Sequence, residues 1–140
     1  MSTTPDFDSL AVGDALPELV KPPLDRLQLA LYAGASSDYN PIHLDDDAAR
    51  AGGLPGVIGH GMLSMAFLGQ LLTGWVPQRQ LRGFSARFVA MTALGDSVTC
   101  RGTVKAKHEV DGERRVELEL SAVTQDGRQV LAGSASVALP

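Results

Sequence analysis

The segment from Ala51 to Gln78 contains no Asp, Glu, Lys or Arg over 28 residues. That length is sufficient to cross a bilayer. However, the segment includes Pro55 and Pro77, and its helical part, about residues 61–75, is too short to span a membrane. A helix that is apolar on every side also forms the buried centre of water-soluble folds. We therefore expect a long buried helix at residues 61–75 and no membrane partner.

The second half of the chain has the period of two that is typical of half-buried strands. Val116, Leu118 and Leu120 alternate with polar or charged residues. Asp-Gly pairs at 111–112 and 126–127 indicate two-residue hairpin turns. Strands are expected near residues 82–90, 96–109, 113–124 and 129–138. Long strands that follow one apolar helix predict an α+β fold, in which a curved antiparallel sheet wraps around the central helix and residues 1–140 form one domain.

The segment before the apolar helix contains a short strand and a capped helix. The strand is expected at Glu18–Lys21. Asp25 is a good N-cap, and Gln28 follows three residues later as in a capping box. Gly34 is placed to end this helix. The apolar stripe of the helix consists of Leu27, Ala30 and Leu31.

Three consecutive acids, Asp45, Asp46 and Asp47, precede an alanine-rich stretch. Acidic residues stabilise helix N-termini, so this pattern predicts a short helix that ends at the Gly52-Gly53 pair. A metal site is the alternative reading. Consecutive carboxylates do not converge well on one ion, and the helix N-terminus is therefore the better interpretation.

Composition excludes several classes of function. The net charge of -4 provides no basic surface for nucleic acid or anionic membranes, and four Phe, two Tyr and one Trp are too few for a base-stacking platform. The single cysteine, Cys100, excludes an internal disulfide and a Cys-based zinc site, and we expect an inert thiol. Residues 1–8 are polar and acidic, so no secretory signal is expected and a cytoplasmic location is predicted.

Reactive groups concentrate in one region. Asp38 and His43 flank a turn that Pro41 holds out of helical geometry. Such a turn can direct a carboxylate and an imidazole at one small volume, where they can hold and deprotonate a water. The apolar helix begins around Gly61, and its first N–H groups have no intrahelical partner. Glycine lets a ligand approach them closely, and they would suit a carbonyl oxygen that gains negative charge.

One combined motif resembles the MaoC-like (R)-specific enoyl-CoA hydratases, also called hydratase 2. The motif is Ser36-x-Asp38-x-Asn40-Pro41-Ile42-His43, followed by Gly59-His60-Gly61-Met62. The resemblance covers the whole chain, and it implies a hot-dog fold, a dimer, and activity on acyl thioesters of coenzyme A or acyl carrier protein. It also implies that Asp38 and His43 are the catalytic pair that binds the water, and that the N–H of Gly61 polarises the thioester carbonyl.

Two positions depart from the family pattern. Many members have glycine where this chain has Ser37. Some bacterial hydratases carry a serine on the central helix that supports the catalytic aspartate, and Gly69 stands at that position here. The support of Asp38 is therefore open, and a small residue at position 69 could instead widen the acyl channel.

Other motif residues have structural interpretations beside functional ones. Asn40 is expected to support the loop through hydrogen bonds from its side chain to the backbone, and His60 to organise the turn before the helix. Both also stand, with Gly61, among the candidate substrate-binding residues. Met62 and Met65 are expected to pack in the core.

The residues and the resemblance together predict a lyase that adds water reversibly to trans-2-enoyl thioesters and gives (3R)-3-hydroxyacyl thioesters. No metal or redox cofactor is expected, because the thioester itself activates C3. One alternative is a hot-dog thioesterase that directs water at the carbonyl, and another is a subunit of a two-chain dehydratase. A long uncharged helix that one sheet cannot cover predicts a homodimer, or a heterodimer with a similar chain.

Overall fold

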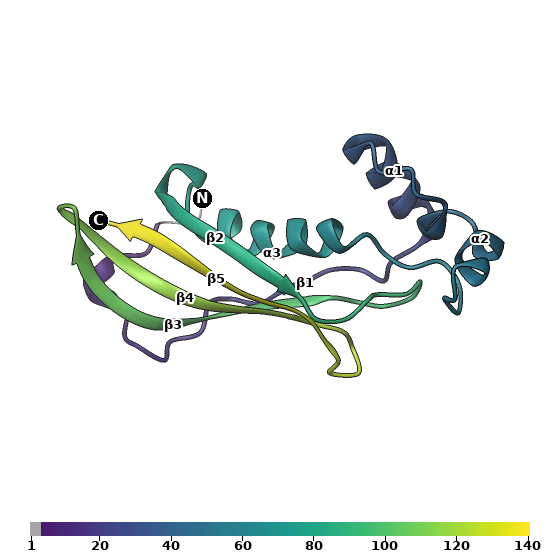
Figure 1. Cartoon of the computed structure of the whole chain (residues 1–140). Coiled ribbons are helices and arrows are strands. Elements are labelled where there is room, and N and C mark those ends of the chain that lie inside the picture. Colours follow the sequence, from purple (N-terminus) through teal and green to yellow (C-terminus); the bar gives the residue numbers. More distant parts are fainter. Residues whose placement is uncertain (1–3) are drawn as a thin grey trace.

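A strongly curved antiparallel sheet forms one layer of the structure, and helix α3 lies in its concave face (Figure 1). The computed structural model describes residues 4–140. Five strands pair in the order β1-β3-β4-β5-β2. Their bounds are Leu19–Val20 (β1), Leu81–Phe88 (β2), Thr99–Val110 (β3), Glu113–Val123 (β4) and Gln129–Leu139 (β5). The expected α+β arrangement of a curved sheet around a central helix is confirmed.

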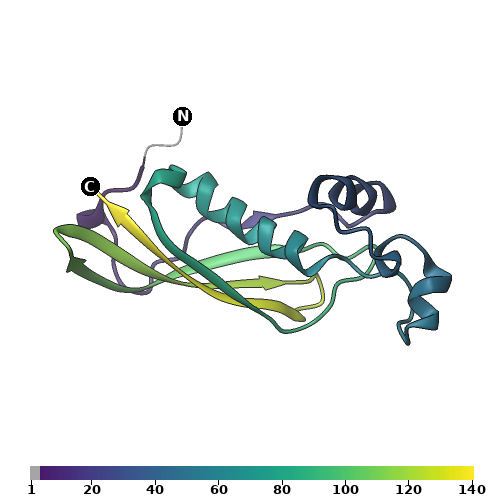
Figure 2. The same ribbon diagram turned by 45° about the horizontal axis from the view of Figure 1, so that its top comes forward.

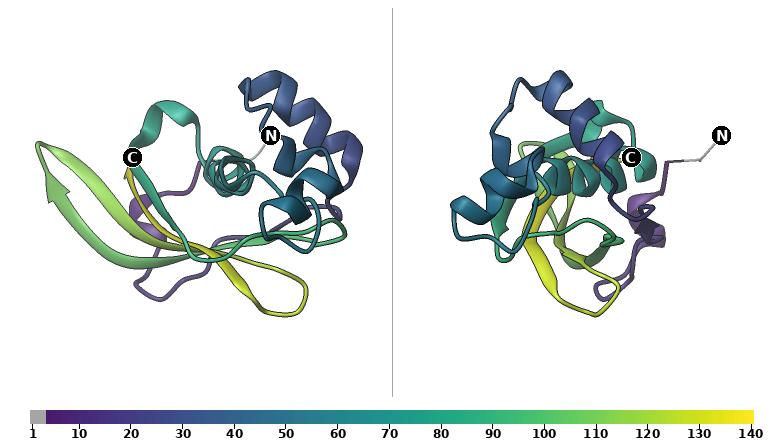
Figure 3. Two further views of the ribbon diagram at one scale, coloured as in Figure 1. Left: turned by 45° about the vertical axis from the view of Figure 1, so that its right-hand side comes forward. Right: turned by 90° about the vertical axis from the view of Figure 1, so that its right-hand side faces the viewer.

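The smaller helices gather at one end of the molecule. In chain order, the helical elements are η1 (Phe7–Ser9), α1 (Arg26–Ser36), η2 (Pro41–His43), α2 (Asp46–Ala51), α3 (Gly61–Trp75) and η3 (Gln78–Gln80). Helices α1 and α2 lie beyond the N-terminal end of α3 in Figure 2, and Figure 3 shows the same helices from two further directions. The connection between α1 and α2 contains Asp38 and His43, so the fold brings the candidate catalytic loop to the start of the central helix.

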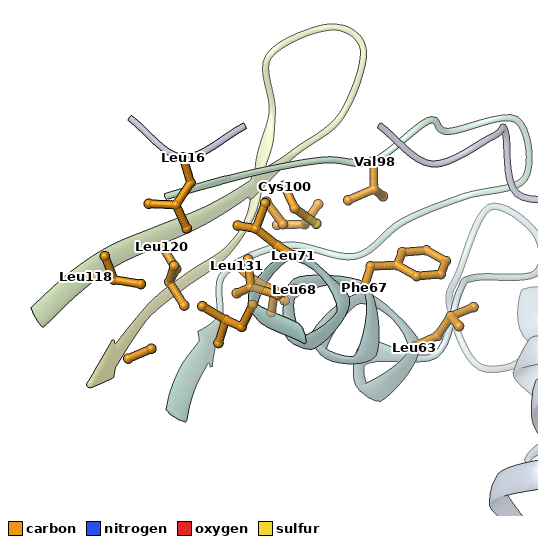
Figure 4. Close-up of a cluster of buried hydrophobic side chains, with 14 of the residues drawn as sticks. Leu16, Leu63, Phe67, Leu68, Leu71, Val98, Cys100, Leu118, Leu120 and Leu131 are labelled. Atoms are coloured by element: carbon orange, nitrogen blue, oxygen red, sulfur yellow. The ribbon is translucent and has the colours of Figure 1, made fainter. Parts of the chain in front are cut away.

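The long strands agree with the period-two pattern. Val116, Leu118 and Leu120 are all buried, and they belong to the core that packs around α3 (Figure 4). Register shifts in β2, β3 and β4 interrupt the regular pairing, and such bulges increase the twist and bend of strands. Cys100 on β3 is also fully buried, and burial raises the pKa of its thiol to about 11, as expected for an inert core residue.

One of the two expected two-residue hairpins is present. At the β3–β4 turn, Asp111 and Gly112 have φ values of 52° and 76°, and positive φ at both central residues is what a type I′ turn requires. The prediction of a two-residue turn at 126–127 is wrong. Residues 124–128 join β4 to β5, the N–H of Thr124 donates to the carbonyl of Arg128 at 2.9 Å, and only Gly127 has positive φ.

Helix α3 begins and ends as expected, but only one side of it is buried. Its buried residues are Leu63, Ser64, Phe67, Leu68, Leu71 and Leu72. Met62 is 54% exposed, so the expectation that it packs in the core is wrong, whereas Met65 is partly buried. A single sheet covers only the side of the helix that faces it. Within residues 4–140, no helix combines the length and the apolar character needed to span a membrane.

Helix α1 starts at the expected cap and ends later than expected. The Asp25 carboxylate accepts a hydrogen bond from the N–H of Gln28 at 2.8 Å, which confirms the N-cap. The helix continues past Gly34 to Ser36, because the left-handed conformation that ends it (φ 61°) falls on Ser37. A left-handed residue after the last turn is a common helix terminator.

The apolar stripe of α1 does not face the core of its own chain. Leu27 and Leu31 are 67% and 65% exposed, whereas Leu29 and Ala33 are buried. The expected stripe is therefore an uncovered apolar surface in the single chain. Helix α2 follows the prediction, since Asp45 caps it by accepting the N–H groups of two residues in its first turn.

Candidate active site

The loop between α1 and η2 brings the two predicted catalytic side chains together. Asp38 Oδ2 lies 3.8 Å from His43 Nε2. Three short contacts hold the loop: Asp38 N donates to Ser36 Oγ, Asn40 N donates to Asp38 Oδ1, and Ile42 N donates to Asn40 Oδ1, each at 3.2 Å. The Asp38 side chain is 49% exposed, so this carboxylate is accessible to solvent and to a ligand.

The tautomer of His43 follows from its backbone partner. His43 is 7% exposed, and its Nδ1 lies 2.8 Å from the carbonyl oxygen of Ile58. A carbonyl oxygen only accepts, so Nδ1 carries the hydrogen. In the neutral ring, Nε2 then has a free lone pair directed toward Asp38. In this tautomer, Nε2 of His43 can accept a hydrogen bond.

His60 is the buried neighbour of this pair. Its ring stacks on that of His43 with centroids 3.8 Å apart, and it forms a T-shaped pair with Tyr32, whose ring centroid is 4.7 Å away. Its Nε2 donates to the backbone carbonyl of Asp38 at 3.2 Å, and its Nδ1 has no partner among the described residues. Burial lowers the pKa of His60, because the charged form loses its hydration. His60 thus links the loop to the start of α3.

The three side chains of this cluster also carry atom types that bind metal ions. Asp38, His43 and His60 each offer an atom within 4.8 Å of the others. A metal lies in the plane of each imidazole that binds it, whereas the two rings here stack with only 24° between their planes. Both rings would have to turn before they could share an ion. We therefore interpret the cluster as a hydrogen-bonding arrangement.

A cavity of about 270 Å³ lies between this cluster, the start of α3 and the strands. Its polar lining residues are His43, Ser64 and Thr92, and Gly61 also lines it. Most of the remaining lining is apolar, from the end of β2, the segment that follows β2, and β5, and it includes Phe88 and Leu131. A small apolar chamber with a few converging polar groups is the usual form of a small-molecule site.

Gly61 is the first residue of α3, so its N–H has no acceptor within the helix. A Cβ at this position would lie 3.0 Å from the ring of Phe88. The absence of a side chain therefore allows Phe88 to pack against the helix start. Phe88 is 52% exposed at the end of β2, where it can act as one wall of the cavity mouth.

The remaining predicted residues lie outside the cavity lining. Asp38 reaches it only through its contact with His43, and Asn40 acts on the loop backbone as expected. Gly69 lies eight residues after Gly61, about 12 Å along the helix. A Cβ at Gly69 would contact Phe84 of β2 at 3.6 Å, so a side chain at this position would face β2 rather than the loop that carries Asp38 in the same chain.

The sequence reasoning did not single out Ser64, Phe88 or the carbonyl of Ile58. Ser64 had a recognisable signal, since it is the one hydroxyl-bearing residue in the first half of the apolar helix, three positions after Gly61. Phe88 and Ile58 had none. Phe88 meets Gly61 only because two segments distant in sequence fold together, and Ile58 acts through its backbone carbonyl, which every residue has.

Residues 11–126 match the family described as "MaoC like domain". The chain belongs to this family. It is 34% identical to the "(R)-specific enoyl-CoA hydratase" of Rhodospirillum rubrum over 121 residues, which are 84% of this chain and 81% of that protein. The solved structure of R-hydratase PhaJ1 from Pseudomonas aeruginosa has a TM-score of 0.84 at 29% identity and covers 96% of this chain and 85% of that chain.

The chain also matches a small part of much longer fungal proteins. The chain is 38% identical over 122 residues to "Fatty acid synthase subunit beta" of Aspergillus oryzae, covering 84% of this chain but only 6% of that subunit. This MaoC-like chain therefore corresponds to a small part of such synthases and to most of the length of the bacterial hydratase. The family expected from the motif is confirmed, and the names of these relatives agree with the expected enzyme class.

Proposed function

We propose that this MaoC-like protein reversibly adds water to trans-2-enoyl thioesters and forms (3R)-3-hydroxyacyl thioesters. The observation that carries the proposal is the 3.8 Å approach of Asp38 Oδ2 to His43 Nε2, beside a cavity that His43 and Gly61 both line. A base, a second water ligand and a free N–H donor are the groups that such a hydration needs. The bacterial relative named as an (R)-specific enoyl-CoA hydratase supports the same reaction class.

The first step is activation of water. Asp38 Oδ2 and His43 Nε2 are 3.8 Å apart, too far for a direct hydrogen bond but close enough for one water to contact both at about 2.8 Å. His43 Nε2 accepts a proton from this water as its oxygen bonds to C3. Asp38 orients the water through its remaining hydrogen and stabilises the imidazolium that forms.

The second step concerns the electrons of the substrate. As the C3–O bond forms, the C2–C3 π pair moves to C1–C2 and the carbonyl π pair moves to the thioester oxygen. The N–H of Gly61 stabilises this developing charge, helped by the N-terminal end of α3. The proton held by the dyad then returns to C2 on the same face, and the carbonyl re-forms.

The apolar lining suits the acyl chain of such a substrate, whereas the carrier lies outside the cavity. Coenzyme A and acyl carrier protein present the same thioester and the same pantetheine arm. Activity should therefore be measured with both carriers and with graded acyl lengths. The thioesterase alternative predicts release of the free thiol, which a thiol reagent detects in the same reactions.

We also propose that a second copy of this chain completes the structure. Leu27, Leu31 and Met62 expose large apolar side chains at the end of the molecule that carries the site, and β2 forms a sheet edge that pairs on one side only. Light scattering should give a dimer mass, and Leu27→Glu with Leu31→Glu should weaken the dimer. Val12→Glu, at an exposed apolar residue in the N-terminal segment, is the matched control. An active monomer would contradict this proposal, and activity only with a different hot-dog chain would favour the heterodimer.

The decisive experiment on the reaction is a double-mutant cycle in the dyad. Asp38→Asn and His43→Gln should each lower turnover by at least about 10²- to 10⁴-fold, as expected for general acid–base groups. Because both act on one water, the double variant should be little worse than the poorer single variant. Hydration of crotonyl-CoA and of a longer enoyl-CoA is measured beside thermal melts. Folded single variants with turnover comparable to the wild type would contradict the mechanism.

A further inference from the structure

The hydroxyl group of Ser64 has no role in the mechanism described so far. Ser64 is 4% exposed, yet it lines the same cavity as His43 and Gly61. Among the described residues, none forms a hydrogen bond with its Oγ. A buried polar group usually has a partner, so an unpartnered hydroxyl that faces a cavity indicates that a ligand supplies one.

The position of Ser64 on the helix directs it toward the proposed oxyanion donor. Gly61 is the first residue of α3 and Ser64 is the fourth, so the two lie on one face of the helix. The side chain of a helical residue covers the turn that precedes it. Oγ of Ser64 therefore lies over the helical turn that begins with the free N–H of Gly61.

The usual intrahelical acceptor for this hydroxyl is already occupied. A helical serine commonly donates to the carbonyl four residues earlier, which here is that of His60. That carbonyl already accepts the N–H of Leu63 at 3.1 Å and the N–H of Ser64 at 3.4 Å. Apolar side chains dominate the cavity lining around the hydroxyl. The hydroxyl is thus available to a polar atom of the ligand.

We propose that Ser64 donates a second hydrogen bond to the thioester oxygen, beside the N–H of Gly61. The proposal rests on the hydration function above and adds a catalytic residue to it. No proton is transferred in this role. As the carbonyl π pair moves to oxygen, the O–H of Ser64 strengthens its hydrogen bond and stays bonded to Oγ. Two donors then share the developing charge.

The test compares Ser64→Ala with Ser64→Thr, which keeps the hydroxyl, and with Thr73→Ala, which removes an exposed hydroxyl from the same helix. We expect Ser64→Ala to lower the turnover of crotonyl-CoA hydration by on the order of a hundred-fold. Ser64→Thr should retain most of the activity, and Thr73→Ala all of it. The melting temperature of Ser64→Ala should stay close to that of the wild type, because the hydroxyl forms no hydrogen bond with any described residue.

A spectroscopic measurement isolates the hydrogen bond itself. In the Asp38→Asn background, which slows hydration, bound crotonyl-CoA keeps its thioester carbonyl intact for vibrational spectroscopy. Loss of the Ser64 donor should raise the carbonyl stretching frequency, and Thr73→Ala should leave it unchanged. Should Ser64→Ala fail to fold, the nearly isosteric Ser64→Cys, a weaker donor, serves in both measurements.

Two outcomes separate this inference from the function on which it rests. A wild-type protein that hydrates enoyl thioesters, together with a Ser64→Ala variant of equal turnover and equal carbonyl frequency, would overturn the role of Ser64 alone. A wild-type protein that hydrates no enoyl thioester on either carrier would overturn the proposed function. A Ser64→Ala variant that loses turnover only in proportion to a lower melting temperature would indicate a packing role and also overturn the inference.

Discussion

Gly61→Pro removes the N–H group that we propose as the first donor to the thioester oxygen. The structure makes this substitution unusually clean, because proline is well tolerated at the first position of a helix, where the N–H has no intrahelical acceptor. The preceding residue, His60, already has φ -63° and ψ 131°, the extended conformation that a residue before proline prefers. Helix α3 should therefore form.

The contact with Phe88 provides the matched control. A Cβ at Gly61 would lie 3.0 and 3.1 Å from two atoms of that ring, whereas ordinary contact begins at 3.4 Å. The ring must move by a few tenths of an ångström, and its exposure of 52% leaves room for this movement. Gly61→Ala introduces the same contact but keeps the N–H. The difference between the two variants therefore reports mainly the lost donor.

The expected magnitude follows from the role of the donor. Loss of one oxyanion donor typically costs about 2.7–4 kcal/mol, on the order of 10²- to 10³-fold in turnover. Gly61→Ala should lose less than about ten-fold, which corresponds to about 1.4 kcal/mol. The assay follows the absorbance of the conjugated thioester of crotonyl-CoA, with melting temperatures recorded in parallel. A folded Gly61→Pro variant with the turnover of Gly61→Ala would refute the donor role.

Three further predictions concern stability and reactivity. Burial lowers the pKa of His60 below its ordinary 6.5, so near pH 6 the unfolded chain binds a proton at this residue more readily than the folded chain does. The stability of the protein should therefore fall as the pH drops below about 6.5. His60→Asn should reduce this pH dependence of the melting temperature between pH 7 and pH 5. Asp25→Ala should cost about 0.5–2 kcal/mol in urea unfolding, whereas Asp25→Asn keeps the cap. Cys100, fully buried with a pKa of about 11, should react with an alkylating reagent only on unfolding, so fast labelling of the native protein would contradict its assigned burial.

The parts of the fold that could be predicted depend on local patterns. The bounds of α3 follow from an apolar run that begins after Gly59-His60, and the β3–β4 turn follows from the conformational freedom of Asp111-Gly112. The end of α1 could not be located, because Gly34 is the stronger local signal and Ser37 takes the left-handed conformation instead. A single serine carries no pattern that identifies this conformation.

The direction in which an apolar face points could not be predicted either. The spacing of Leu27 and Leu31 indicates that one face of α1 is apolar, and Met62 belongs to the apolar run of α3. Spacing does not say whether the chain itself or another molecule covers that face. In the structure these three side chains are exposed, while Leu29, on the opposite face of α1 from Leu27 and Leu31, is buried.

In the candidate site too, local geometry could be predicted from the sequence, whereas contacts between distant segments could not. The proximity of Asp38 and His43 could be predicted from a short proline-containing turn, because both residues belong to one loop. The carbonyl of Ile58 determines which nitrogen of His43 carries the hydrogen. Every residue has a backbone carbonyl, so the sequence does not show which one His43 contacts. Phe88 reaches Gly61 through the path of β2, which only the folded topology defines.

The left-handed conformation of Ser37 also bears on how this protein can vary over generations. For a residue with a side chain, that conformation is less favourable by roughly 1–2 kcal/mol, and glycine removes most of the penalty. The residues accepted at position 37 therefore depend on how easily they adopt a positive φ. Glycine and asparagine should be accepted, and β-branched residues should be selected against. Because the neighbouring residue is Asp38, such changes should alter the stability of the candidate catalytic loop without altering its functional groups. A lineage that acquires glycine there gains tolerance to destabilising mutations elsewhere in the chain.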